Sequence, residues 1–245
     1  ARAYRSGAVL AYILVVATFL ALYLRGYIYS LESVIDPYNI SIYAGVIAYV
    51  VFMTQFLLSA RIAWLERLLG QDMLLRAHGF LGIAVFGAIA VHGVIKFSYI
   101  GATPQSALGV ASALIYIVLT PAAILILQGR AASRASAHGV SPRYERAKIR
   151  HNILVIAALL AVAHVQLASS TYSLLLRMAT LGLAVISLGA YVNHKYIRPR
   201  RARRFRVTAV EKRPGNIVAI AMEPADGKGT LSRRPGQFAY FRFAS

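Results

Sequence analysis

The chain lacks cysteine altogether and has few acidic residues. With no Cys among 245 residues, disulfide bonds, thiolate nucleophiles and cysteine-ligated metals are excluded. Only 8 residues are Asp or Glu, against 27 that are Lys or Arg, and all the acidic ones fall outside the long apolar runs. A transporter or channel that relays protons through histidines would need acidic partners inside those runs, so this class is disfavoured.

Long apolar runs dominate what is present. Hydrophobic residues make up 58% of the chain, and the mean hydropathy is +0.61, too high for a soluble domain of this length. A helix needs about 20 apolar residues to cross a bilayer. The sequence therefore predicts an all-α membrane protein with six transmembrane helices, at 7–24, 40–60, 77–96, 107–128, 151–169 and 172–193.

Basic residues are distributed unevenly between the connections. A net charge of +19 would suggest a nucleic-acid partner in a soluble protein, but here Lys and Arg follow the positive-inside rule instead. We therefore expect a multi-pass plasma-membrane protein, in a bacterium the inner membrane, with both termini cytoplasmic and no nucleic-acid role. The cytoplasmic cations are Arg2, Arg5, Arg61, Arg67, Arg76, Arg130, Arg134, Arg143, Arg146, Lys148, Arg150 and seven from Lys195 to Arg206; Arg25, Lys96 and Arg177 are the outer ones.

Four histidines lie inside apolar helical runs. His78 and His92 are 14 residues apart, so on an ideal helix they lie within about 40° of one face and ~21 Å apart in rise. His151 and His164 are 13 residues apart, which leaves an azimuthal error of about 140°. Either that helix is locally over-wound, or its two histidines point to different sides.

The third and fifth spans run in the same direction, which pairs these histidines by depth. His78 and His151 share the inner level, and His92 and His164 share the outer level. Each cross-helix pair can supply both axial ligands of one haem iron, so the sequence predicts a six-helix haem-binding bundle with two stacked b-type haems. We interpret His138 and His194, which lie near water, as non-ligands. Small residues beside the ligands clear space but also favour ordinary helix packing: Gly79, Gly82, Gly87, Gly93, Ala157, Ala158, Ala161 and Ala163.

The chain changes character after Tyr196. A six-helix domain at 1–196 is followed by a basic linker at 197–204 and by short β-type runs in 205–245. Strands are expected at 205–210, 216–223 and 237–243, the last led by Pro235-Gly236. Because three strands cannot close a barrel, 205–245 is interpreted as an incomplete β-structured domain.

The chain resembles the NADPH oxidase and ferric reductase family of transmembrane electron-transfer proteins. The third helix of that family carries two histidines with thirteen residues between them and the fifth carries two with twelve between, as do His78/His92 and His151/His164 here. Tyr144-Glu145 is similar to the family's approach to its fifth helix. The segment Arg234-Pro235-Gly236-Gln237-Phe238-Ala239-Tyr240-Phe241 resembles the opening of a ferredoxin-reductase-type flavin β-barrel.

This resemblance implies an oxidoreductase that moves electrons outward. NAD(P)H would reduce FAD in the cytoplasm, and single electrons would pass through the inner and then the outer haem to oxygen, giving superoxide or peroxide. A ferric-chelate reductase on the same scaffold is the alternative. A cytochrome b electron-transfer subunit without its own oxidase activity is a third, against which the β-type tail argues. The family's flavin-contacting and nucleotide-binding segments come later than the point where this sequence stops, and the choice of nicotinamide and the oligomeric state stay open.

Basic residues near the histidines are candidates for contacts with anions. Haem propionates need cationic partners, and Arg76, Lys148 and Arg150 are placed for the inner haem, Lys96 and Arg177 for the outer. Positive-inside anchoring explains the inner cations equally well. Lys96 lies one turn outward of the outer histidine on the third span, and a basic residue there is similar to the oxygen-reducing pocket of oxidase members. Lys96 and Arg177 are therefore the candidate catalytic residues, although snorkelling to the interface is an alternative for Lys96.

Overall fold

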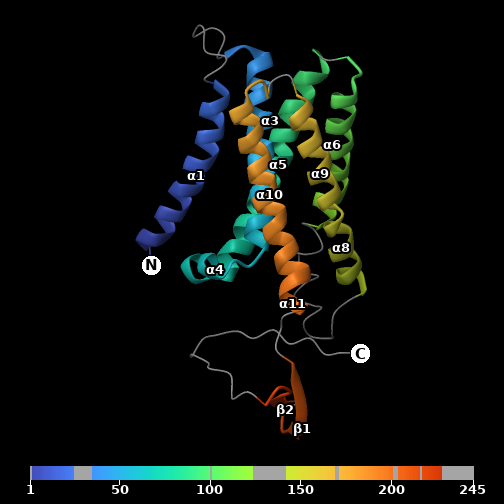
Figure 1. Ribbon diagram of the computed structural model, residues 1–245. Coiled ribbons are helices and arrows are strands. Elements are labelled where there is room, and N and C mark those ends of the chain that lie inside the picture. Colours follow the sequence, from blue (N-terminus) through green and yellow to red (C-terminus); the bar gives the residue numbers. More distant parts are fainter. Residues whose placement is uncertain are drawn as a thin grey trace. The chain divides into compact units, whose positions relative to one another are not determined.

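The computed structural model describes residues 2–24, 35–99, 101–123, 142–168, 171–200, 204–215 and 217–227. The chain divides into two compact units, Ala1–Lys195 and Tyr196–Ser245. The first unit is an assembly of helices and the second contains a β-hairpin (Figure 1). The predicted strand at 237–243 and the flavin-type motif at 234–241 lie outside the described residues, as does His138.

Helices account for all the regular structure of the first unit. In chain order they are α1 (Arg2–Leu24), α3 (Pro37–Ser59), α4 (Ala63–Leu69), α5 (Gln71–Phe97), α6 (Pro104–Ala123), α8 (Pro142–Asn152), α9 (Leu154–Leu167) and α10 (Leu174–Val192). A short π-helical turn, η2 (Asn193–Ile197), continues α10, and α11 (Arg198–Arg200) follows it.

Five helical segments of the described chain are long and apolar enough to cross a membrane. They are Pro37–Ser59, Gln71–Phe97, Pro104–Pro121, Arg146–Leu167 and Leu174–Ile197, and they correspond to the second to sixth predicted spans. The first predicted span falls on α1, whose apolar part, Leu10–Leu24, is shorter than these five. Fifteen or so helical residues rise only about 22 Å, against a hydrocarbon core of about 30 Å. The expectation of six full-length spans is therefore met by five.

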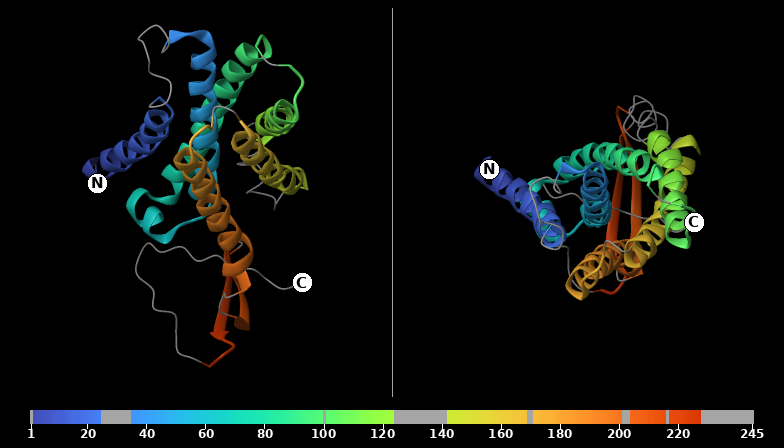
Figure 2. Two further views of the ribbon diagram at one scale, coloured as in Figure 1. Left: turned by 45° about the horizontal axis from the view of Figure 1, so that its top comes forward. Right: turned by 90° about the horizontal axis from the view of Figure 1, so that it is seen from above.

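The centre of the first unit is α3. It packs against α1, α5, α9 and α10, which lie around it in the view from above (Figure 2). Val50 and Met53 at its middle are fully buried. The Tyr49 hydroxyl donates to the backbone oxygen of Thr180 in α10 at 2.8 Å. Such a bond between helices gives the buried hydroxyl a hydrogen-bond partner, which lipid and packed apolar side chains do not offer.

Local sequence fixes where the helices begin. Asp36 caps α3 by accepting from the amide of Tyr38 at 2.9 Å, with Pro37 at the first helical position. Gly70 ends α4 and precedes α5 with a φ of 79°, a conformation that other residues rarely adopt. Ser173 caps α10 by accepting from the amide of Leu176 at 3.1 Å.

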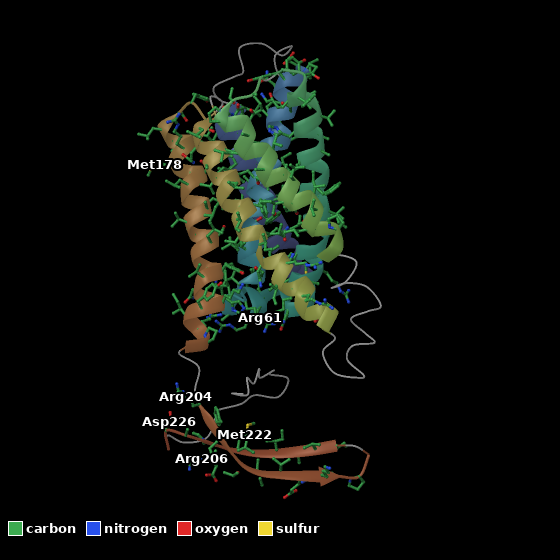
Figure 3. All side chains as sticks on the ribbon, turned by 90° about the vertical axis from the view of Figure 1, so that its right-hand side faces the viewer. Arg61, Met178, Arg204, Arg206, Met222 and Asp226 are labelled. Atoms are coloured by element: carbon green, nitrogen blue, oxygen red, sulfur yellow. The ribbon has the colours of Figure 1, made fainter. Side chains whose placement is uncertain are left out.

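The two ends of the helical unit differ in charge. Arg61, in the connection from α3 to α4, lies at the same end as α4 and α8, whereas Met178 of α10 lies at the opposite end (Figure 3). Arg67 and the cations of α8 belong to the first of these ends. This segregation is the arrangement on which the positive-inside assignment rests.

The second unit contains one antiparallel hairpin. Strand β1 (Phe205–Arg213) pairs with β2 (Ile217–Pro224) from Phe205↔Pro224 to Arg213↔Ile217, with a bulge between Val207 and Ala209. Gly215, in the turn, has a φ of 80°. These strands match the first two that the sequence predicts, and among the described residues they form a two-stranded sheet. The flavin β-barrel stays a prediction.

Candidate functional site

Two histidine pairs meet inside the helical unit. The ring centroids of His78 in α5 and His151 in α8 are 5.9 Å apart, and those of His92 in α5 and His164 in α9 are 6.2 Å apart. In both pairs the ring planes make an angle of 77°. The structure therefore brings together the two pairs that depth and helix direction predict from the sequence.

A tight turn between α8 and α9 places His151 and His164 on a common side. The amide of Ile153 donates to the carbonyl of Arg150 at 3.0 Å, and the amide of Ile156 donates to that of Ile153 at 2.8 Å. These bonds span three residues rather than four, so the chain there turns about 120° per residue instead of 100°. Over these residues the gain is roughly 100°, most of the ~140° that an ideal helix lacks. The fifth span is thus locally over-wound.

The two helices that carry the outer histidines each pack mainly against a different neighbouring helix. Helix α5 packs along α3, and α9 packs along α6. The imidazoles therefore reach toward one another from two distinct helix pairs. This arrangement leaves each ring positioned by its own neighbour, α3 for the α5 histidines and α6 for His164.

Both outer histidines are held by a backbone carbonyl of that neighbouring helix. Nδ1 of His92 lies 2.7 Å from the oxygen of Ser41 in α3, and Nδ1 of His164 lies 2.9 Å from the oxygen of Gln105 in α6. A carbonyl oxygen can only accept, so Nδ1 carries the proton in both rings. In the neutral imidazole this leaves the lone pair of Nε2 free to bind a metal.

Each of these carbonyls is followed four residues later by a glycine against which the imidazole rests. A Cβ built on Gly45 would lie 2.7 Å from Nδ1 of His92, and one on Gly109 would lie 2.7 Å from Nδ1 of His164. Real Cβ atoms do not approach that closely. The same arrangement therefore occurs twice, once in each helix pair: a carbonyl that accepts the Nδ1 proton and, four residues later, a glycine that leaves room for the ring. The residues are Ser41 with Gly45 and Gln105 with Gly109.

The inner histidines differ from the outer ones in their hydrogen bonding. Nδ1 of His78 and Nδ1 of His151 are buried and make no hydrogen bond within the described residues. His78 faces the backbone of Gln55 in α3 without reaching hydrogen-bond geometry. Gln55 follows Ser41 by the same 14 residues that separate His78 from His92, as the antiparallel packing of α3 on α5 requires.

Ring separations near 6 Å have a specific chemical meaning. An imidazole nitrogen bonds a metal at about 2.0–2.1 Å, and the ring centre lies roughly 1.1 Å behind that nitrogen, so two opposed imidazoles on one metal place their centroids about 6.3 Å apart. Among the described residues, no group of three or more His, Cys, Asp or Glu is arranged to hold a metal ion. Each pair by itself offers two imidazole rings as possible ligands.

The level between the two pairs is filled by residues that the sequence did not single out. Tyr116 of α6 is buried and donates to the oxygen of Gly82 in α5 at 2.9 Å. Ser112, one turn earlier, donates to the oxygen of Ala157 in α9 at 2.8 Å. The ring of Phe52 meets that of Tyr116 edge-on, with centroids 4.9 Å apart. The sequence contains 15 tyrosines, and no feature of the sequence distinguishes Tyr116 from the others as a residue between the two pairs.

The two candidate catalytic residues have different surroundings. Lys96 is half-buried, and its Nζ lies 3.3 Å from the centroid of the Tyr38 ring, which in turn meets Tyr99 edge-on. Arg177 is exposed, and its Nε donates to the oxygen of Thr171 at 2.8 Å. Lys96 is thus positioned beside an aromatic surface, whereas Arg177 is engaged in the connection between α9 and α10.

The predicted inner cations surround the opposite end. Arg76, Lys148 and Arg150 are all exposed, the first on α5 and the others on α8. His194 lies in the turn η2 beyond the end of α10. Within the described part of the chain, no hydrogen bond joins these cations to His78 or His151, and their candidate role toward propionates stays a prediction.

A polar chain reaches the neighbour of His151. Lys195 donates from Nζ to the hydroxyl of Tyr191 at 2.7 Å, and that hydroxyl donates to Oδ1 of Asn152 at 3.2 Å. The Tyr191 ring also meets Phe56 of α3 edge-on, at 5.5 Å between centroids. These contacts anchor the end of α10 to α8 and α3 beside the inner pair.

Comparison with known proteins assigns no family. No protein-family model matches the chain, and a search of curated proteins finds no match. The geometry of the histidine pairs is therefore the basis for assigning a function.

Proposed function

We propose that the chain binds two b-type haems and conducts electrons across the membrane. The observation that carries this proposal is the pair of opposed imidazole sets, with centroids 5.9 and 6.2 Å apart, at two levels of one apolar helical unit. On this proposal His78 and His151 ligate the inner iron, and His92 and His164 ligate the outer iron.

The residues present fit haem better than a bare metal ion. A porphyrin supplies four nitrogens to its iron, so the protein has to supply only two opposed ligands, which is what each pair offers. The Nδ1–H tautomer of His92 and His164 directs Nε2 to the metal. When bound, each haem supplies a one-electron redox couple at its level.

The helices separate the two levels by a distance suited to a membrane relay. Residues 78 and 92 are 14 apart on one helix, which corresponds to a rise of ~21 Å. Tyr116, Phe52 and buried alanines fill the interval and exclude water from it. If His92 and His164 both ligate the outer iron, no site on that iron is left for an acceptor, which would then be reduced at the outer end of the relay without binding iron.

The outer acceptor on this proposal is oxygen. Lys96 sits one turn beyond His92 and places a positive charge where superoxide would form. Overall, NAD(P)H and two oxygen molecules would give NAD(P)⁺, a proton and two superoxide ions, with FAD and the haems supplying the step from a two-electron donor to one-electron transfer. Ferric chelates are the alternative acceptor, since the same cation attracts an anionic chelate.

The remaining parts of the proposal follow from the family resemblance. The β-hairpin would begin the flavin β-barrel, α1 would be the sixth crossing, and both termini would face the cytoplasm of a plasma membrane. On the resemblance, the protein would be an NAD(P)H oxidase or ferric reductase-type enzyme that uses FAD. NAD(P)H, oxygen or ferric chelate, and the bilayer are its partners.

A vesicle assay tests electron conduction directly. The purified protein is placed in lipid vesicles that contain trapped ferricyanide, and dithionite is added outside. We expect reduction of the trapped ferricyanide, and at least a tenfold slower rate for His92→Ala. A wild-type rate equal to that of empty vesicles would overturn the proposal.

A further inference from the structure

Two glycines, each on a helix without histidines, lie directly against the imidazoles of the outer pair. Gly45 of α3 and Gly109 of α6 each leave room for an imidazole where a Cβ would come within 2.7 Å of Nδ1. Several other helix glycines of the described unit lack such a close neighbour. A Cβ on Gly82 would lie 3.7 Å from its nearest neighbour, and those on Gly87, Gly93, Gly182 and Gly189 would meet nothing within 4 Å.

We infer that Gly45 and Gly109 are positioning residues that set the orientation and the electron-donating strength of the outer iron ligands. This inference rests on the proposed haem binding. The glycines do not touch iron. They allow the carbonyls of Ser41 and Gln105 to accept the Nδ1 protons of His92 and His164 at 2.7 and 2.9 Å.

The geometry of an α-helix explains why the glycine stands four residues after the carbonyl. The carbonyl of residue n accepts from the amide of residue n+4 and has a second lone pair to offer. An imidazole that uses this lone pair must lie beside residue n+4, where a side chain would block it. Ser41 with Gly45 and Gln105 with Gly109 both meet this condition.

The chemical consequence concerns the iron. A hydrogen bond from Nδ1 to a carbonyl fixes the tautomer and raises the basicity of the opposite nitrogen. A more basic ligand favours ferric over ferrous iron, which lowers the midpoint potential of that haem. Among the described residues, Nδ1 of the inner ligands His78 and His151 has no hydrogen-bond partner, so the inner haem would serve as an internal reference.

The first experiment compares Gly45→Ala and Gly109→Ala with Gly182→Ala, a control on α10, which carries none of the four histidines, whose new Cβ meets nothing within 4 Å. Potentiometric titration and electron paramagnetic resonance report each haem separately. We expect the outer midpoint potential to rise and the outer ferric signal to change in both variants. The inner haem, and both haems of Gly182→Ala, should stay as in the wild type.

A double-mutant cycle covers the case in which an alanine variant loses haem or folds poorly. Thermal unfolding is measured for Gly45→Ala in the wild-type and in the His92→Ala background, and for Gly109→Ala with His164→Ala. If the glycine serves the imidazole, the drop in unfolding temperature should largely disappear once the ring is gone. A drop of the same size in both backgrounds would mean ordinary helix packing and would overturn the inference.

The outcomes separate the two proposals. A wild-type protein without haem contradicts the proposed function, while the double-mutant cycle still reports on the contact between glycine and imidazole. A wild-type protein with two haems whose outer potential and ferric signal are unchanged in both alanine variants contradicts the inference alone. Equal shifts of the inner and outer haems would also contradict it.

Discussion

The imidazoles of His92 and His164 face each other at 6.2 Å between centroids with their planes 77° apart. They belong to separate helix pairs, and each is fixed from behind by a carbonyl of its own neighbour. Their relative orientation is therefore set by four helices rather than by a loop. A site built in this way resists reorientation, because moving either ring requires a packed helix to shift.

The ring orientation predicts a spectroscopic signature. If each pair ligates one iron, its two nearly perpendicular imidazoles should make both ferric haems low-spin with strongly anisotropic electron paramagnetic resonance signals. The ferrous protein should then not bind carbon monoxide, because histidine would fill both axial positions. A carbon monoxide complex formed rapidly at either haem would show that one axial ligand is not histidine.

The over-wound turn at Ile153 should be sensitive to a change in residue number. Inserting one alanine between Ile153 and Leu154 rotates His164 by about 100° relative to His151. We expect the haem content to fall from two to one per chain, measured as pyridine haemochrome. An alanine inserted between Gly101 and Ala102, in the connection before α6, is the control and should retain both haems. Two haems in the first variant would show that the turn does not set the ligand direction.

Substitution of Lys96 should affect the rate of reaction with oxygen, whereas substitution of Arg177 should affect stability. Lys96→Gln should slow reoxidation of the dithionite-reduced protein by oxygen roughly tenfold, the low end of electrostatic steering, with the difference shrinking in high salt. Arg177→Gln should change this rate little and instead lower the unfolding temperature, since its Nε donates to Thr171. Stopped-flow reoxidation and thermal unfolding measure the two effects. If Arg177→Gln slowed reoxidation as much as Lys96→Gln, this division would be wrong.

The hydroxyl of Tyr116 should contribute to stability without being needed for haem binding. Tyr116→Phe removes its bond to the oxygen of Gly82 and should cost about 0.6–1.5 kcal/mol of unfolding free energy. Tyr116→Ala should cost about 3–5 kcal/mol, because it leaves a cavity in the buried centre. Denaturant unfolding in detergent measures both. Loss of haem from Tyr116→Phe would assign the hydroxyl a role that the structure does not suggest.

Much of the helical framework is predictable because length and hydropathy leave few alternatives. Five of the six predicted spans coincide with helices long enough to cross a membrane, and co-directional helices with histidines at matched depths bring those histidines together. The exception among the spans is α1, whose apolar part is shorter than the window placed on it. Its residues near the basic N-terminus are helical but add no further apolar run.

The details of the site depend on contacts between segments that sequence periodicity does not encode. The spacing of His151 and His164 left two alternatives open, and only the three-residue bonds at Ile153 decide between them. Gly45 and Gly109 lie on helices that carry no histidine, whereas the small-residue pattern in the sequence points to the glycines of the third span. A glycine at the depth of a histidine on a neighbouring helix is the signal that would have found them.

Haem content across a set of histidine variants tests the central claim most directly. Pyridine haemochrome analysis of the wild type, His92→Ala, His164→Ala and the double variant should give two, one, one and one haem per chain, because both substitutions remove the same outer haem. His138→Ala and His194→Ala should retain two. Fewer than two haems in the wild type, or a double variant that loses more haem than either single one, would contradict the assignment of His92 and His164 to one iron.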